Sequence, residues 1–217
     1  MSRSSATQQL DAVQQLVRHD GAALDVSELP SYGFSHRSVM WWATAGMMAI
    51  EGTVFALAVA TYFYLRSHST TWPMSSPPPD LLYGTLNTAV LLLSLLPNEW
   101  AKRAAEKEDL RGVRIALVLS TAMAVAFVVV RAFEFTALNV RWDANAYGSI
   151  VWMLMGLHTI HLLTDNYDTA VLAVLSFVEK MDGKRYVDVS ENALYFYFVV
   201  LTWLPIYAVV YWAPRST

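Results

Sequence analysis

The chain of 217 residues contains no cysteine. This absence excludes disulfide bonds, thiolate metal clusters, a dinuclear copper centre built on thiolates, and the covalent haem attachment that needs a C-x-x-C-H motif. Charge is also scarce: Asp, Glu, Lys and Arg make up 15% of the residues, whereas soluble domains carry about 25%. Gly-rich phosphate loops and basic patches interleaved with aromatic residues are missing, which argues against nucleotide and nucleic-acid binding.

Hydrophobic residues make up 55% of the chain and come in long blocks. Blocks of this length predict helices that cross a membrane. Residues 1–37 are polar and contain no apolar core, so we do not expect them to form a cleavable signal peptide. We interpret them as a cytoplasmic tail, with a candidate amphipathic helix around residues 7–19, followed by one membrane domain over residues 38–213.

The apolar blocks predict an all-α integral membrane bundle of five transmembrane helices. A hydrocarbon core of about 30 Å needs roughly 20 residues per helix, and tilt takes up the excess of longer helices. The predicted spans are Val39–Leu65, Leu81–Leu96, Ile115–Leu138, Tyr147–Val178 and Ala193–Trp212. We expect Pro97 to end the second span, and a charged loop over residues 98–114 to lead into the third.

Lysine and arginine are divided unevenly between the two sides of this bundle. If the N-terminus is cytoplasmic, eleven of them lie inside, three lie outside, and Arg131 lies within a span. The inside set is Arg3, Arg18, Arg37, Lys102, Arg103, Lys107, Arg111, Arg114, Lys180, Lys184 and Arg185, and the outside set is Arg66, Arg141 and Arg215. Because cytoplasmic loops are enriched in Lys and Arg, we predict a cytoplasmic N-terminus and an external C-terminus.

Seven Asp, Glu, Arg and His residues fall inside the predicted spans. They are Glu51, Arg131, Glu134, His158, His161, Asp165 and Asp168. An ionised side chain at mid-bilayer costs roughly 2.5–3.5 kcal/mol on insertion scales. The last four lie in the segment "GLHTIHLLTDNYD", at steps of three, four and three residues that place them on one helix face. We therefore expect these residues to form an intramembrane polar network that faces the bundle or a partner subunit, not lipid.

Depth within the spans predicts the pairing of these residues. Glu51 and His158 both come near the midplane, so we expect a hydrogen bond between Glu51 and a histidine of the fourth span. Arg131 and Glu134, three residues apart, can pair on one helix face. Three interpretations of the His/Asp stripe stay open: contacts that hold helices together, a proton or water relay, and a metal site. A haem is not among them, because two histidines on one helix face cannot approach iron from opposite sides.

Five segments, in order along the chain, resemble the subunit III family of cytochrome c oxidases and other haem-copper oxidases. They are "WWATAGMMAIEGTVFALAVATYFYLR", "LNTAVLLLS", "VVVRAFEF", "YGSIVWMLMGLHTIHLL" and "ENALYFYFVVLTWLPIYAVVYW". The resemblance runs from about residue 39 to residue 212 and fits the short five-helix members of that family. It places the family's marked acidic residue at Glu51, its two histidines at His158 and His161, and its later glutamate at Glu134.

The resemblance implies a non-catalytic subunit of a respiratory oxidase, without redox cofactors of its own, in the plasma (inner) membrane of a bacterium. Its implied partners are the catalytic subunit I and subunit II, in which haem and copper are expected, together with phospholipid in an intramembrane cleft. The implied roles are assembly, support of proton uptake, and protection of the catalytic subunit during turnover. Nucleic acid is not an expected partner.

Two departures from the family pattern leave alternatives open. The final span lacks the histidine and aspartate of the family's W-H-F-V-D, and "TDNYD" stands where the family has small apolar residues. We expect Asp165 and Asp168 to bond to neighbouring helices and to substitute for the polar groups that the final span lacks; a hydrated path inward is the alternative. An accessory protein of a nitric oxide reductase and a stand-alone proton-coupled carrier are the alternative functions.

Overall fold

The computed structural model describes residues 32–74 and 76–216, and this part of the chain contains helices and no strand. Five α-helices are long and apolar enough to cross a membrane. They are α2 (Val39–Ser67), α3 (Leu81–Glu106), α4 (Leu110–Thr136), α5 (Ala146–Val178) and α6 (Gly183–Tyr207). A 3-10 turn, η1 (Ser35–Arg37), precedes α2, and a π-helical turn, η2 (Ala208–Trp212), and a second 3-10 turn, η3 (Ala213–Arg215), follow α6. The predicted five-span, all-α class is confirmed.

Four of the long helices begin at a residue whose side chain caps the first turn. Ser38 accepts from the Met40 amide before α2, and Asp109 accepts from the Arg111 amide before α4. Asn145 and Asp182 cap α5 and α6 in the same way. Because the first amides of a helix have no partner within the helix, such oxygens fix where a helix begins.

The helices extend further than the apolar blocks predict. Pro97 does not end the second span but lies inside α3, which continues to Glu106, and α4 begins at Leu110 instead of residue 115. Most of the expected loop over residues 98–114 is therefore helical. The segment is rich in Ala, Glu, Lys and Arg, which favour helix, so the helices continue past the apolar region into polar surroundings. Helix α6 also begins ten residues before the predicted span, at a first turn capped by the Asp182 side chain.

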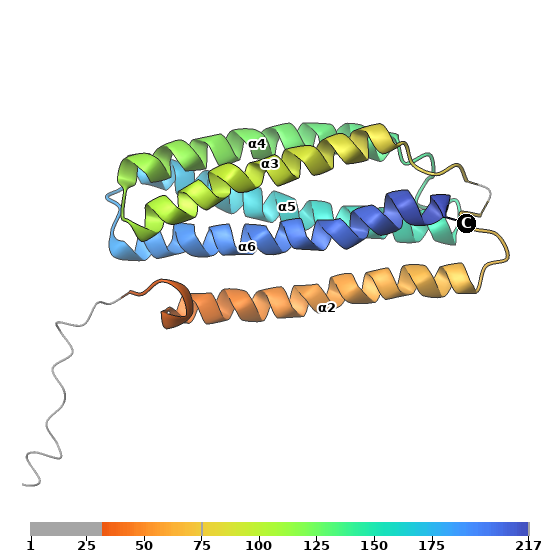
Figure 1. Cartoon of the computed structure of the whole chain (residues 1–217), viewed down its shortest axis with the longest axis horizontal. Helices are drawn as coiled ribbons and strands as arrows, with labels where there is room; N and C mark the ends of the chain where they lie inside the picture. Colours follow the sequence, from red (N-terminus) through yellow and green to blue (C-terminus); the bar gives the residue numbers. More distant parts are fainter. Residues whose placement is uncertain (1–31, 75, 217) are drawn as a thin grey trace, which may run out of the picture. The chain divides into compact units, whose positions relative to one another are not determined.

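Helices α3, α4, α5 and α6 form a four-helix bundle, and α2 packs along α5 and α6 only (Figure 1). In the most apolar part of α2, 11% of the residues are buried within the chain, compared with 56% in the last span. Helix α3 approaches the C-terminal turn closely, because the Tyr211 ring fills the space that a Cβ at Gly84 would occupy. Because so little of α2 is buried within the chain, its exposed side is available to lipid or to another subunit.

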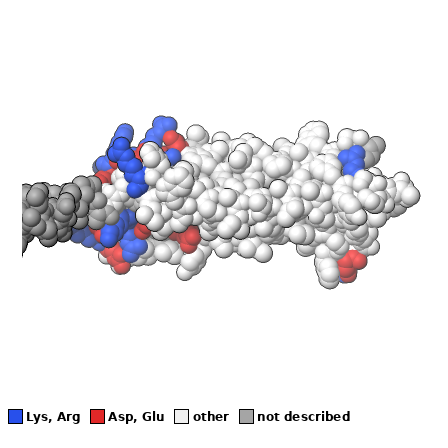
Figure 2. All heavy atoms as spheres, turned by 90° about the horizontal axis from the view of Figure 1, so that it is seen from below, with Lys and Arg blue, Asp and Glu red and all other residues white. Residues whose placement is uncertain are grey.

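Charged side chains gather at one end of the helices, which Figure 2 shows as blue and red atoms beside a broad uncharged band. This end contains the turn between α3 and α4, the turn between α5 and α6, and the start of α2 (Figure 1). The opposite end carries few charged groups in this view. The predicted division of Lys and Arg is therefore also a division in space. Residues 1–31, with the candidate helix around residues 7–19, lie outside the described residues.

Candidate functional site

Glu51 lies on α2 at the point where this helix meets α5 and α6. The Tyr195 hydroxyl on α6 donates a hydrogen bond to Glu51 Oε2 over 2.8 Å. Nε2 of His161 on α5 lies 3.6 Å from Glu51 Oε1. The Glu51 side chain is 23% exposed and that of His161 is 14% exposed. One carboxylate thus links the three helices that meet along this side of the bundle.

The hydrogen bonds of His161 decide how it can act on Glu51. Its Nδ1 lies 2.7 Å from the Leu157 carbonyl oxygen. A carbonyl can only accept, so Nδ1 carries a proton and donates. Nε2 then faces the carboxylate in one of two states: protonated, as an ion pair, or unprotonated, as the acceptor of a proton held by Glu51. At 3.6 Å, the two groups are close enough for an electrostatic interaction but are further apart than a hydrogen bond allows.

Two grooves lie along α2, one lined by Glu51 and the other by its neighbour Gly52. The first has a volume of about 540 Å³ and lies between α2, α5 and α6 on the charged side of Glu51. Its polar lining residues are Thr44, Glu51, Thr164, Asp168, Arg185, Asp188, Glu191, Asn192 and Tyr195. The second has a volume of about 460 Å³, lies between α2 and α6, and is lined almost entirely by apolar residues such as Phe55 and Phe198. Glu51 thus belongs to the first groove, here called the polar groove, and Gly52 to the second, the apolar groove.

A second polar cluster lies within the four-helix bundle. Arg131 and Glu134 on α4 are 2% and 0% exposed, and Arg131 Nη1 lies 3.0 Å from Glu134 Oε2. The Asn87 amide and the Tyr211 hydroxyl each donate a hydrogen bond to the Glu134 carboxylate. A buried ion pair is stable only when further hydrogen bonds satisfy its atoms. The Glu134 carboxylate receives such bonds from α3 and η2, whereas Arg131 Nε has no hydrogen-bond partner among the described residues.

His158 belongs to this inner cluster and not to the Glu51 site. Its Nε2 lies 3.1 Å from the Val199 carbonyl oxygen, so Nε2 donates and Nδ1 is free to accept. Arg131 Nη2 lies 3.3 Å from Nδ1 and donates to it. The Arg131 guanidinium also lies over the Trp203 ring, 4.2 Å from its centroid. The two histidines, expected together near Glu51, are therefore divided between two sites.

The two aspartates of the stripe are also divided. Asp165 is 2% exposed and lies between the helices, with no hydrogen-bond partner for Oδ1. Asp168 is exposed in the chain and lines the polar groove. We expected both to bond to neighbouring helices, and the described residues provide no such bond for Asp165 Oδ1.

Several members of these clusters were not singled out from the sequence. They are Asn87, Thr88, Tyr195, Trp203 and Tyr211. Tyr195, Trp203 and Tyr211 lie in the final span. This span has no charged residue, so a search for charged groups within the spans does not find them. One chemical signal points to them, because a buried Tyr or Trp usually needs a hydrogen-bond partner for its O–H or N–H. The carboxylates of the other spans are candidate acceptors. In residues 32–74 and 76–216 no three His, Asp or Glu side chains are grouped so as to hold a metal ion.

The chain has relatives among known proteins. The family described as Cytochrome c oxidase subunit III matches residues 73–214. A "Cytochrome c oxidase subunit 3" from Thermostichus vulcanus is 22% identical over 167 residues, covering 74% of this chain and 81% of that protein. A "Probable cytochrome c oxidase subunit 3" from Nocardia farcinica is 26% identical over 168 residues, covering 76% and 83%.

A longer relative, the "Cytochrome c oxidase subunit 3" of Chondrus crispus, is 26% identical over 127 residues, which cover 58% of this chain and 47% of that protein. The chain thus matches most of the length of some relatives and about half of others. The family match covers well over half of the chain and contains four of the five long helices. The chain belongs to the cytochrome c oxidase subunit III family, the non-catalytic subunits of haem-copper oxidases.

Proposed function

We propose that this chain supports proton uptake, assembly and stability of a haem-copper terminal oxidase in a bacterial plasma membrane. In this proposal it packs against the catalytic subunit I and subunit II, which hold the haem and copper. The relatives named above carry the name of an oxidase subunit, which favours this function over a stand-alone carrier or a nitric oxide reductase system. The orientation in the membrane is part of the proposal: the charged end of the helices faces the cytoplasm.

The contact of Glu51 with His161 carries the proposal. In this proposal Glu51 Oε1 and His161 Nε2, which lie 3.6 Å apart, exchange one proton, and Glu51 lines the polar groove. The groove leads from the charged end of the helices, where residues such as Arg185 and Asp188 line it. Carboxylates and histidines that line a wet groove can collect protons and pass them on. In the proposed orientation this groove draws protons from the cytoplasmic side.

The apolar groove favours a bound phospholipid. Its walls are mostly apolar side chains of α2 and α6, and its lining residue Gly52 follows Glu51 of the polar groove in the chain. An acyl chain in the apolar groove with its headgroup towards the charged end would match both parts. In this proposal the lipid fills the space between α2 and α6.

Two substitutions of Glu51 test the role in proton supply. Glu51→Gln keeps an acceptor for the Tyr195 hydroxyl but cannot share a proton with His161, whereas Glu51→Ala loses both functions. We expect the complex with Glu51→Gln to assemble almost normally and to lose oxidase activity faster during sustained turnover. Glu51→Ala should in addition assemble poorly.

Glu99→Gln provides the matched control. Glu99 on α3 also accepts from a tyrosine of α6, Tyr197, but it does not line the polar groove. Its amide variant should therefore retain the wild-type lifetime of activity. Equal assembly and equal lifetimes of activity in the wild type and both Glu51 variants would contradict the proposed role of this site.

A further inference from the structure

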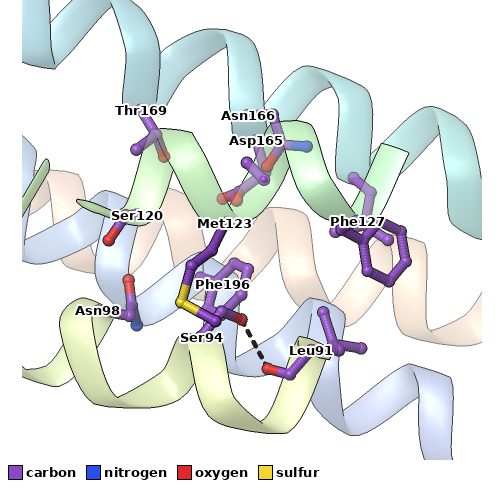
Figure 3. Close-up of a pocket in the computed structure, with 12 residues that line it drawn as sticks. Leu91, Ser94, Asn98, Ser120, Met123, Phe127, Asp165, Asn166, Thr169 and Phe196 are labelled. Carbon is purple, nitrogen blue, oxygen red and sulfur yellow. Dashed lines mark hydrogen bonds between the residues drawn. The ribbon is translucent and has the colours of Figure 1, made fainter. Parts of the chain in front are cut away.

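A small cavity lies inside the four-helix bundle, apart from both grooves. It has a volume of about 20 Å³, and side chains of α3, α4, α5 and α6 line it. Figure 3 shows the Asp165 carboxylate pointing from α5 into this space, with Ser120 of α4 and Asn98 of α3 on the same side of it. A cavity needs roughly 10–15 Å³ of such space to hold a water molecule, so one water fits here.

The lining of the cavity is unusually rich in polar atoms that lack a partner. Asp165 Oδ1, Ser120 Oγ and Asn166 Nδ2 are all buried and have no hydrogen-bond partner among the described residues. They come from two helices, and all three residues line the same cavity. A buried water normally makes two to four hydrogen bonds to such groups, whereas cavities that stay dry are apolar. The cavity therefore has both the room and the partners for a water molecule.

The charge state of Asp165 follows from its surroundings. No Lys, Arg or His lines the cavity. Asp168, the nearest charged residue along α5, lies three residues away and brings no positive charge. An isolated carboxylate without a counter-ion is far too costly to bury, so such a group takes up a proton. A protonated carboxyl can donate to a water and accept from it, which the Asp165 cavity permits.

We propose that Asp165 and the cavity form an internal proton-holding site, in which a protonated Asp165 carboxyl binds one water molecule. Nothing in the function proposed for Glu51 requires this site, because its lining is separate from that of the two grooves. The resemblance described above does not imply this site either, because in that family pattern small apolar residues follow the second histidine.

One hydrogen bond links the lining of this cavity to the lining of the polar groove. Thr169 lines the cavity, Asn192 lines the groove, and Asn192 Nδ2 donates to Thr169 Oγ1 over 2.8 Å. Transient opening of this bond lets groove water reach the cavity. In the exchange, the Asp165 O–H bond breaks and its proton passes to water while a proton from water returns to the carboxylate. The balance is one proton for one proton, and no other reactant is needed.

Infrared difference spectroscopy of the complex that contains the full chain tests the proposal. The carbonyl stretch of a protonated carboxylic acid is well separated from the bands of a carboxylate. We expect Asp165→Asn, which has nearly the same shape, to remove one protonated-acid band near neutral pH. Asp168→Asn, the matched control on the groove side, should leave that band in place. In D2O the band should shift, because the proton exchanges.

Two further variants keep the test decisive if Asp165→Asn assembles poorly. Ser120→Ala retains the carboxyl but removes a partner of the water, so the band should change frequency without loss. Thr169→Val removes the acceptor of the hydrogen bond between Asn192 and Thr169. It should change the rate of the D2O shift by roughly tenfold, which is the rate factor that corresponds to the free energy of one hydrogen bond. An unchanged acid region in Asp165→Asn, or a band unaffected by Ser120→Ala, overturns the proposal. The proposal is also overturned if the band that Asp165→Asn removes is that of an ionised carboxylate and this band moves when sodium replaces potassium. Such a result would indicate a cation site.

Discussion

At the scale of single residues, the buried pair of Arg131 and Glu134 carries more weight than any exposed ion pair among the described residues. Its groups are almost inaccessible, and the Glu134 carboxylate also accepts from Asn87 and Tyr211. Removing one member of a buried pair leaves the other charge without compensation, which costs about 3–5 kcal/mol. We therefore expect Glu134→Ala to lower the free energy of unfolding in detergent by about this amount.

The exposed pair of Arg103 and Glu99 provides the comparison. Its nitrogen and oxygen are 2.6 Å apart, but the Arg103 side chain is 69% exposed. Exposed pairs contribute at most about 1 kcal/mol, so Arg103→Ala should change stability little. The double variant Arg131→Met with Glu134→Gln should lose less than the sum of the two single changes. Equal stability of Glu134→Ala and Arg103→Ala would show that the buried pair does not hold the bundle together.

The sequence allowed only part of the residue-level arrangement to be predicted. The pairing of Arg131 with Glu134 follows from their spacing on one helix, and the distance between them agrees. Spacing on α5 could not tell which histidine meets Glu51, because this depends on how α2, α5 and α6 are rotated against one another. The lack of a hydrogen-bond partner for Asp165 Oδ1 could not be predicted for the same reason, because the residues around it come from four helices.

At the scale of helices, the weak packing of α2 against α6 is the feature with the clearest consequence. Proposed lipid binding in the apolar groove can be tested by filling it from α2. Ala56 lines this groove and Val54 does not. We expect Ala56→Phe to reduce the number of phospholipids that remain with the purified complex, as counted by native mass spectrometry. Val54→Phe adds an aromatic ring to the outer face of the same helix and should retain them; equal lipid counts in both variants would argue against a lipid in this groove.

The helices themselves were largely predictable, and their ends were not. Apolar blocks mark the part of each helix that lies in hydrocarbon, so all five spans were found. Helix formation does not stop where the apolar block ends, as the last three turns of α3 show. The prediction that Pro97 ends the helix was wrong. A proline inside a helix costs one backbone hydrogen bond, and the packing of α3 against its neighbours outweighs that loss.

At the scale of the whole chain, the asymmetry of charge predicts which end faces the cytoplasm. The absence of cysteine makes this directly testable, because a single introduced thiol is the only one in the chain. Lys107 lies in the turn between α3 and α4, and Asp143 lies between α4 and α5 at the opposite end. In intact cells, a maleimide that cannot cross membranes should label Asp143→Cys and not Lys107→Cys. Labelling of Lys107→Cys before the membrane is opened would reverse the proposed orientation.

The measurement that tests the central claim most directly is purification of the tagged chain from its own membranes in mild detergent. We expect it to bring down a larger, haem-bearing subunit with a Soret absorption band and oxidase activity. After the subunits are separated, this chain should be colourless and free of stoichiometric copper, because the oxidase chemistry lies in its partners. A chain that purifies alone, or that keeps a Soret band once every partner has been removed, would contradict its assignment as a non-catalytic oxidase subunit.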